Sequence, residues 1–359
     1  MIEQVPAEVL EAFTSGLPIQ DAGMITVEST GNGLINHSYK VAFGQKPGFF
    51  LQRFNKNVFR DPRAVQENYI HLWEYAEFEF TGIRMPRPLN HSAGESLFRD
   101  KQGDYWRAFE FIREGSSIAI PQTASRAKAT AKAFARFTAA FEEFNTNLLK
   151  EVIPGFHDLG LRFSQFEESL SNGLPEKLAA SAHLTDELIK RERYRHFYDI
   201  ITESGEFPLR VMHHDAKIGN ILFHHQTGRV ICPVDYDTVM PGYFFSDLGD
   251  MVRSMAGDRE ENSNSPGGIN IRPDFYEAIL AGYTAVLGKQ FSTSEKKYLH
   301  SAGLLMIYMQ ALRFLTDYHT GDKYYQTDHE RQNLERAENQ FSLLKALEEF
   351  LVRKYTFSI

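Results

Sequence analysis

The chain changes character near Gly115, and this change limits the folds that it can adopt. Before that point, short runs rich in Val, Ile, Thr, Tyr and Phe alternate with Gly and Pro turns, which is typical of β-strands. After it, long segments carry apolar residues at three- and four-residue spacing, which is typical of helices. We therefore expect an α+β protein with a small antiparallel sheet at the front and a larger helical part behind it.

A length of 359 residues is about twice that of a common single domain, so we expect two lobes, residues 1–112 and 113–359. Short strands and turns interrupt the helices of the second lobe at residues 209–255. The predicted strands are 24–30, 39–43, 48–54, 95–98 and 104–112, and a helix runs from Asp61 through Ala76. The predicted helices of the second lobe are 124–149, 162–170, 177–203, 275–287, 294–317 and 329–354.

Composition excludes several classes of protein. Lys and Arg total 39 against 47 for Asp and Glu, and the net charge of -8 argues against a nucleic-acid partner. Cys232 is the single cysteine, so neither an internal disulfide nor a cysteine-based zinc site is available. The N-terminus does not resemble a secretory signal, and no apolar run approaches the roughly 18 residues that span a bilayer. We expect a cytoplasmic protein with no membrane partner.

The strongest site signal is the segment from His213 to Asn220, followed fifteen residues later by Asp235. The residues between them read as two strands around a turn at 226–228, with Asn220 and Asp235 equidistant from the midpoint of 227 and 228. A hairpin of this kind would bring the two side chains to facing strands about 4.8 Å apart. An amide oxygen beside a carboxylate suits Mg²⁺, which prefers hard oxygen ligands.

Asp215 lies on the connecting loop, near the predicted metal but free to accept a proton, and Lys217 could supply a cation. This division of roles is that of phosphoryl transfer. Taken singly, each residue is also a common loop, turn or cap residue. The order His-x-Asp-x-Lys-x-x-Asn, then a hairpin, then Asp is more specific, because it repeats the order of the kinase catalytic loop and its metal aspartate. We expect His213 to be structural and His214 to face solvent.

This segment resembles the superfamily of aminoglycoside phosphotransferases and choline kinases, which have a two-lobed protein-kinase-like fold. The resemblance implies that Asp215 is the general base and that Asn220 and Asp235 bind Mg²⁺. Asp247 matches an Asp-Leu-Gly element of the superfamily, which we interpret as structural, with its acid capping free amides at a helix N-terminus.

The front of the chain supports an ATP-binding lobe more weakly. Gly31 and Gly33 lie between two strands, where backbone amides can approach phosphates. The segment 109–115 resembles the hinge that binds adenine through its backbone, at Phe111 and Arg113. The superfamily usually has Lys or Arg on the third strand to hold phosphates. Here the candidates are Gln52 and Arg53, and the alternation of side chains lets only one of them point at the nucleotide unless the strand bulges.

Within the superfamily, separated stretches of the chain are similar to bacterial N-acetylhexosamine 1-kinases, which phosphorylate the anomeric hydroxyl of N-acetylglucosamine and N-acetylgalactosamine. Gln52 in place of Lys also fits this subgroup. A sugar site needs directional polar groups and an aromatic or apolar wall. His157, Arg313 and Tyr318 are candidates for it, beside Asp215.

Our leading hypothesis is an ATP- and Mg²⁺-dependent sugar kinase. The enzymatic alternative is a phosphotransferase of the same fold that acts on an aminoglycoside, choline, homoserine or another sugar. The non-enzymatic alternative is a nucleotide-binding module without turnover, suggested by the missing strand lysine. The sequence leaves the oligomeric state open.

Overall fold

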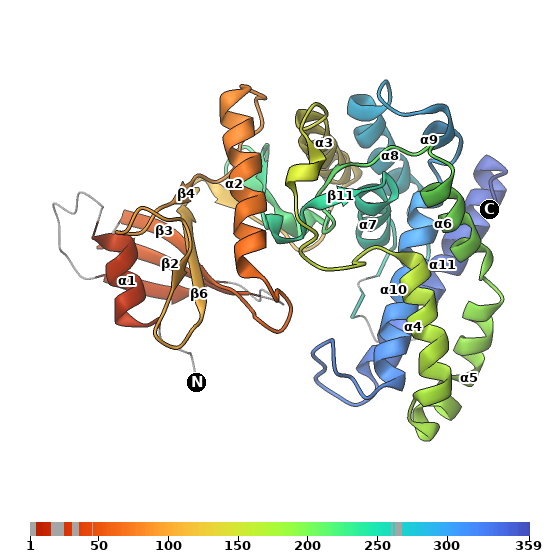
Figure 1. Cartoon of the computed structure of the whole chain (residues 1–359). Helices are drawn as coiled ribbons and strands as arrows, with labels where there is room; N and C mark the ends of the chain where they lie inside the picture. Colours follow the sequence, from red (N-terminus) through yellow and green to blue (C-terminus); the bar gives the residue numbers. More distant parts are fainter. Residues whose placement is uncertain (1–4, 16–24, 31–35, 45, 260, 263–267) are drawn as a thin grey trace. The chain divides into compact units, whose positions relative to one another are not determined.

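The computed structural model describes residues 5–15, 25–30, 36–44, 46–259, 261–262 and 268–359, which form two compact units (Figure 1). The chain passes between the units more than once. These units therefore do not coincide with the two lobes, 1–112 and 113–359, that we expect from the sequence. The functional division into those lobes stays a prediction. The first unit comprises Met1–Ser116, Glu143–Pro154 and Leu222–Met240, and the second comprises Ser117–Glu142, Gly155–Ile221 and Pro241–Ile359.

The first unit is built on an antiparallel sheet with the strand order β1-β2-β3-β6-β4, and β5 also pairs with β6. In the pairing of β3 with β6, Gln52 lies directly opposite Arg107. The elements of this sheet and its two helices are α1 (Ala7–Thr14), β1 (Ile25–Ser29), β2 (His37–Phe43), β3 (Lys46–Arg53), α2 (Pro62–Phe78), β4 (Pro88–Leu89), β5 (Phe98–Arg99) and β6 (Tyr105–Glu110).

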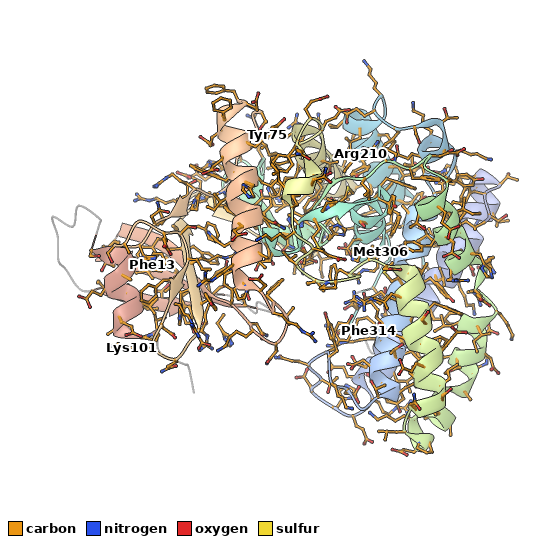
Figure 2. The ribbon with its side chains drawn as sticks, in the orientation of Figure 1. Phe13, Tyr75, Lys101, Arg210, Met306 and Phe314 are labelled. Carbon is orange, nitrogen blue, oxygen red and sulfur yellow. The ribbon has the colours of Figure 1, made fainter. Side chains whose placement is uncertain are left out.

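The two faces of this sheet carry different partners. On one face, Phe13 of α1 packs against Phe49 of β3, in a core of buried apolar side chains (Figure 2). The sequence pattern does not predict α1. On the other face, Tyr69 of α2 meets the ring of Phe109 at 4.9 Å between centroids. Helix α2 begins where we expect it, because the side chain of Asp61 accepts hydrogen bonds from two free amides of its first turn.

A second small sheet contains the hairpin that follows the predicted catalytic loop. Its strand order is β10-β9-β7, formed by β7 (Gly115–Ser116), β9 (Ile221–His224) and β10 (Val230–Pro233). The amide of His224 donates to the carbonyl of Arg229 (2.8 Å). The turn is therefore centred one residue earlier than the midpoint that we predict. Gly228 explains the shift, since its left-handed φ of +67° closes a longer turn in which the amide of Gly228 donates to the carbonyl of His224.

The second unit is mainly helical. Helix α10 packs against α4, α7 and α11, and α3 packs against α8. All of α10 is buried except Arg313 and Thr316, and Met306 lies in its core (Figure 2). None of the helices in the described ranges has the length and apolar character that crossing a bilayer requires. The elements are α3 (Ala124–Ala140), α4 (Leu159–Asn172), α5 (Pro175–Ile189), α6 (Arg193–Glu203), β8 (Arg210–Met212), β11 (Met240–Gly242), α7 (Phe245–Met255), α8 (Pro273–Leu287), α9 (Thr293–Lys297), α10 (Ser301–His319) and α11 (Gln332–Tyr355).

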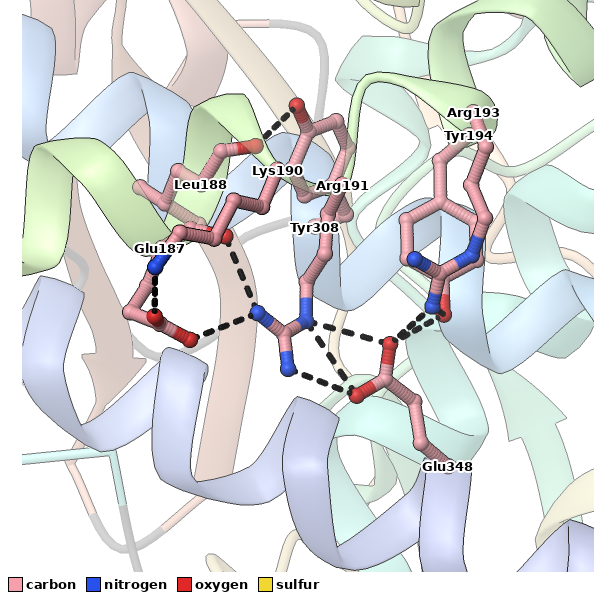
Figure 3. Close-up of polar contacts among 8 residues, drawn as sticks. All are labelled: Glu187, Leu188, Lys190, Arg191, Arg193, Tyr194, Tyr308 and Glu348. Carbon is pink, nitrogen blue, oxygen red and sulfur yellow. Dashed lines mark hydrogen bonds and ion pairs between the residues drawn. The ribbon is translucent and has the colours of Figure 1, made fainter.

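The helix that we expect over residues 177–203 is broken into α5 and α6, and Figure 3 shows the polar contacts at the break. In the break, Arg191 donates to the carbonyl of Glu187 at the end of α5 (2.9 Å). The same guanidinium binds Glu348 of α11 through Nε and Nη2 (3.1 Å each), and Arg193 binds Glu348 as well (2.6 Å). This network ties both helices to α11.

Two further helices are shorter than predicted. The helix expected over residues 124–149 ends at Ala140, and that expected over 294–317 is split into α9 and α10. The apolar spacing continues across each break, so periodicity alone does not reveal it. The other expected helices and the central strands of the sheet are present, which confirms the α+β class.

Candidate active site

The predicted catalytic loop lies in the second unit, between β8 and a single turn of 3-10 helix, η2 (Ile218–Asn220). The carboxylate oxygen Oδ2 of Asp215 accepts a hydrogen bond from the side-chain amide of Asn220 (2.8 Å) and pairs with the ammonium group of Lys217 (2.9 Å). The side chain of Asp215 keeps 25% exposure. The structure thus brings three predicted residues together around an accessible carboxylate.

The charge state of Asp215 follows from these contacts. Burial raises its pKa, but the charge and hydrogen bond of Lys217, with the hydrogen bond from Asn220, lower it by more. The net pKa lies below the ordinary value, so Asp215 is an ionised carboxylate at neutral pH. Such a group can accept a hydrogen bond from an approaching hydroxyl.

Asp247 of α7 anchors the start of this loop. It is fully buried, and its carboxylate accepts the backbone amides of His213 (2.9 Å) and His214 (2.8 Å). We expect Asp247 to cap a helix, whereas the amides that it binds belong to the loop. Burial raises the pKa of Asp247 to about 7, although the two amides oppose this. The buried ring of His213 packs against Phe134 and Phe137.

The prediction that His214 faces solvent is wrong. His214 is 5% exposed, because its ring packs against His157, with 3.0 Å between the two Nδ1 atoms. His157 also contacts the hydroxyl of Ser246 (3.1 Å) and stacks on Phe156 at 4.6 Å between centroids. Burial, and then His214 and Arg313, hold the pKa of His157 well below its usual range, so the ring is neutral. A neutral histidine can both donate and accept.

Arg313 joins this group from α10. Its guanidinium lies over the ring of Phe156 (5.0 Å) and near the rings of Tyr324 (5.8 Å) and Tyr325 (5.7 Å). It also donates to the side-chain oxygen of Gln310 (3.2 Å). Two of the predicted acceptor residues, His157 and Arg313, are therefore joined through Phe156.

Tyr318, the third predicted acceptor residue, has a different environment. It is 3% exposed, and the ammonium group of Lys177 lies 4.5 Å from the centre of its ring. Lys177 in turn pairs with Asp322, which follows the end of α10. Its role as an acceptor contact stays a prediction.

The two predicted metal ligands belong to different units, Asn220 to the second and Asp235 to the first, so their approach stays a prediction. The amide nitrogen of Asn220 donates to Asp215, which leaves its oxygen available for a cation. Asp235 has an exposed side chain beside the buried Tyr236. In the described part of the chain no three His, Cys, Asp or Glu side chains gather as a metal site. These hard oxygen donors fit a Mg²⁺ ion that takes its remaining ligands from phosphate and water.

Only some of the predicted nucleotide contacts lie in the part of the chain that the structure describes. Gly31 and Gly33 lie outside the described residues. Phe111 and Arg113 follow the end of β6, as expected of a hinge, and the ammonium group of Lys40 lies over the ring of Phe111 at 5.6 Å. Their contact with adenine stays a prediction.

The strand pair Gln52 and Arg53 alternates across the sheet as predicted. The side-chain oxygen of Gln52 accepts from Nε (3.1 Å) and Nη2 (2.9 Å) of Arg107, on the face that carries α2. Arg53 has its contacts with Asp104 (3.7 Å) and the ring of Trp106 (5.7 Å). A contact of Gln52 or Arg53 with phosphate stays a prediction.

Sequence analysis missed three polar residues of the first unit. Arg107 pairs with Asp237, whose second oxygen accepts from Asn36 (2.5 Å). Asp237 had a signal, since it is the second acid of the Asp-x-Asp segment. The sequence signal for Arg107 is weaker. It is a single charged residue among the aromatic and small residues of a strand.

Comparison with known proteins finds a matching family and similar folds. Residues 26–295 match the model of a family described as the phosphotransferase enzyme family. A microcompartment-associated aminopropanol kinase is similar in structure, with a TM-score of 0.63, 15% identity, and 97% of this chain and 98% of that chain covered.

Two other solved structures are similar. An aminoglycoside phosphotransferase from Alicyclobacillus acidocaldarius has a TM-score of 0.60 and 15% identity, with 98% of each chain covered. A choline kinase from Cryptosporidium parvum has a TM-score of 0.53 and 15% identity, with 92% of this chain and 91% of that chain covered. At these identities the likeness shows the fold, which is that of the kinase-like phosphotransferases.

Proposed function

Because the chain belongs to the phosphotransferase enzyme family, and is therefore a phosphotransferase of hydroxyl-bearing small molecules, we propose that it transfers the γ-phosphoryl group of ATP to a sugar. The acceptor in this proposal is the anomeric hydroxyl of N-acetylglucosamine or N-acetylgalactosamine. The protein would act in the cytoplasm, in keeping with its single, buried cysteine, Cys232.

The observation that carries the proposal is the accessible carboxylate of Asp215, held between the side-chain amide of Asn220 and the ammonium group of Lys217. In the proposed reaction, Asp215 accepts and orients the proton of the acceptor hydroxyl. Lys217, which pairs with it, offsets negative charge on the transferring group. Both roles need fixed positions rather than strong binding, and the amide of Asn220 holds the carboxylate in place.

The nucleotide side of the proposal uses residues of the first unit together with Asn220 of the second. Asn220 and Asp235 would hold Mg²⁺, which when bound offsets the charge of the β- and γ-phosphates. His213 and Asp247 keep a structural role in the proposal. The proposed nucleotide contacts are Gly31, Gly33, Gln52, Arg53, Phe111 and Arg113.

The environment of Arg313 favours a neutral sugar over a cationic acceptor. Arg162 lies close enough to Arg313 that burial and this second positive charge lower the pKa of Arg162 to about 10. Within the described residues, both side chains donate hydrogen bonds to neutral oxygens, those of Gln165, Phe156 and Gln310. Two guanidinium groups that hydrogen-bond neutral oxygens would disfavour a cationic acceptor such as choline or an aminoglycoside, although Asp158 offsets part of the charge of Arg162. His157, Arg313 and Tyr318 are the proposed sugar contacts, and the aromatic rings near Arg313 offer an apolar wall.

The test is incubation with Mg²⁺-ATP and each of N-acetylglucosamine, N-acetylgalactosamine, kanamycin, choline and homoserine, followed by mass detection of phosphorylated product. We expect product with the two N-acetylhexosamines. Product with a cationic acceptor instead would replace the sugar assignment. The absence of product with every acceptor, together with binding of Mg²⁺-ATP, would favour a nucleotide-binding module.

The variant Asp215→Asn tests the role of the carboxylate. We expect turnover to fall by roughly a hundredfold or more, because the amide cannot accept the proton, while ATP binding is retained. The matched control is Asp274→Asn, at an exposed position in the first turn of α8, which should keep normal turnover. Normal turnover of Asp215→Asn with the true acceptor would remove Asp215 from this role.

A further inference from the structure

A buried ion pair in the first unit has no part in the chemistry described above. Arg107 of β6 is 2% exposed and pairs with Asp237, which is 3% exposed. The guanidinium also donates two hydrogen bonds to Gln52, and it lies over the rings of Phe54 (4.5 Å) and Phe109 (5.0 Å). Buried charges are stable only when their geometry and hydrogen bonds offset the loss of water. Arg107 is therefore held in one orientation by four neighbours.

Asp237 is an anchor rather than a candidate metal ligand. Its Oδ1 atom pairs with Arg107 and its Oδ2 atom accepts from the side-chain amide of Asn36 (2.5 Å). The side-chain oxygen of Asn36 is itself held by the backbone amide of Asn55 (2.9 Å). Both carboxylate oxygens thus bind fixed donors of the sheet and its loops, and the charge of Asp237 is balanced by Arg107.

The segment that Asp237 anchors has an unusual backbone. Asp235 adopts the left-handed conformation, with φ 66° and ψ 61°, which is uncommon for a residue other than glycine. The hydroxyl of Tyr236 donates to the carbonyl of Pro233 (2.8 Å), and the amide of Asn68 donates to the carbonyl of Val239 (3.2 Å). A strained conformation persists where its surroundings determine it several times over, and such sites are often functional. The ion pair is the charged part of these restraints.

We propose that Arg107 is a positioning residue for metal binding: acting through Asp237, it holds the turn that presents Asp235, without touching the metal itself. The proposal rests on the proposed function, in which Asp235 binds Mg²⁺. Arginine suits the position because its planar, rigid group serves Gln52 and Asp237 at once, which the single ammonium group of lysine does not. Residues that orient a metal ligand in this way typically change metal affinity by about 10- to 100-fold.

The experiment measures the affinity for ADP by calorimetry with and without Mg²⁺. The increase in ADP affinity on adding Mg²⁺, here called the metal gain, is thereby separated from binding of the nucleotide itself. Asp235→Asn should abolish this gain. Arg107→Lys should reduce it by about tenfold or more, while metal-free ADP binding changes by less than about twofold. The double variant Arg107→Gln with Asp237→Asn should behave like Arg107→Lys. Because the double variant leaves no buried charge unpaired, it keeps the test valid even where Arg107→Lys does not fold.

The outcomes separate the two proposals. An unchanged metal gain in both the Arg107→Lys and the double variant overturns the positioning role, provided that Asp235→Asn loses the gain. Equal losses of affinity with and without Mg²⁺ also overturn it, since they would show an effect on the nucleotide or on the whole unit. If the wild-type protein shows no metal gain, or Asp235→Asn keeps it, the metal site of the proposed function fails and the inference fails with it.

Discussion

At the scale of single residues, buried charges have the clearest consequences. Gln52 stands at the strand position where the resemblance leads us to expect a basic residue, and its side-chain oxygen accepts two hydrogen bonds from Arg107. Its amide nitrogen donates to the hydroxyl of Ser38 (3.1 Å). An acceptor at this position therefore satisfies two donors of the buried guanidinium on the neighbouring strand.

This explains why a lysine should be harmful here. Gln52→Lys would place a second cation against the buried guanidinium, and we expect it to destabilise the protein by on the order of 2–4 kcal/mol. The control is Gln52→Met, which has a similar length and loses the hydrogen bonds without adding charge. Urea unfolding of both variants measures the difference. A lysine variant as stable as the wild type would contradict the tight packing of Arg107 against position 52.

Asp247 makes the stability of the second unit depend on pH. Its folded pKa of about 7 lies above the ordinary value of 3.8, so between these values the folded state binds a proton that the unfolded state releases. The contribution of Asp247 to the free energy of unfolding is therefore fully present below about pH 4. This contribution is lost as the pH rises toward 7.

Asp247→Asn removes this titration. We expect the variant to gain stability relative to the wild type by about 2–3 kcal/mol as the pH rises from 5 to 8, measured by urea unfolding at both values. Asp274→Asn, at an exposed position, controls for the loss of a carboxylate. A difference between Asp247→Asn and wild type that does not vary with pH would show that Asp247 titrates near its ordinary pKa.

At the scale of elements, close contact between helices depends on small residues. A Cβ atom on Gly282 of α8 would lie 2.4 Å from the backbone oxygen of Lys128 and 3.1 Å from Cβ of Ala131, both on α3. Helix propensity favours alanine over glycine by about 1 kcal/mol, yet the helices cannot approach this closely with a side chain at the contact.

We therefore expect Gly282→Ala to lower stability by about 1–3 kcal/mol, against the direction of helix propensity. Thermal unfolding provides the measurement. Gly268→Ala is the control, because a Cβ atom there meets nothing within 4 Å. A stabilised Gly282→Ala variant would mean that α3 and α8 are not in such close contact.

At the scale of the whole molecule, the proposed reaction needs groups from both units. The carboxylate of Asp215 belongs to the second unit and that of Asp235 to the first. We expect removal of Mg²⁺ by a chelator to abolish phosphoryl transfer, and added Mg²⁺ to restore it, as followed by mass detection of product. Circular dichroism before and after chelation serves as the control for folding. Undiminished transfer without a divalent cation would contradict the metal-dependent mechanism.

The α+β class, most elements and the grouping of Asp215, Lys217 and Asn220 could be predicted because they depend on local spacing. Strand alternation and helical periodicity are written in neighbouring residues, and the three site residues lie within one loop. The breaks within the helices could not be predicted, since they depend on distant partners such as Glu348 for Arg191.

The amino-acid sequence by itself determined the order of the catalytic motif and the family to which its chemistry belongs. Only the tertiary structure paired Arg107 with Asp237, which are 130 residues apart, and His214 with His157, which are 57 apart. The physical reason is that a polar side chain needs a partner only when packing removes it from water. Which distant groups meet at a buried position is decided by how sheet and helices pack, and no local pattern records it.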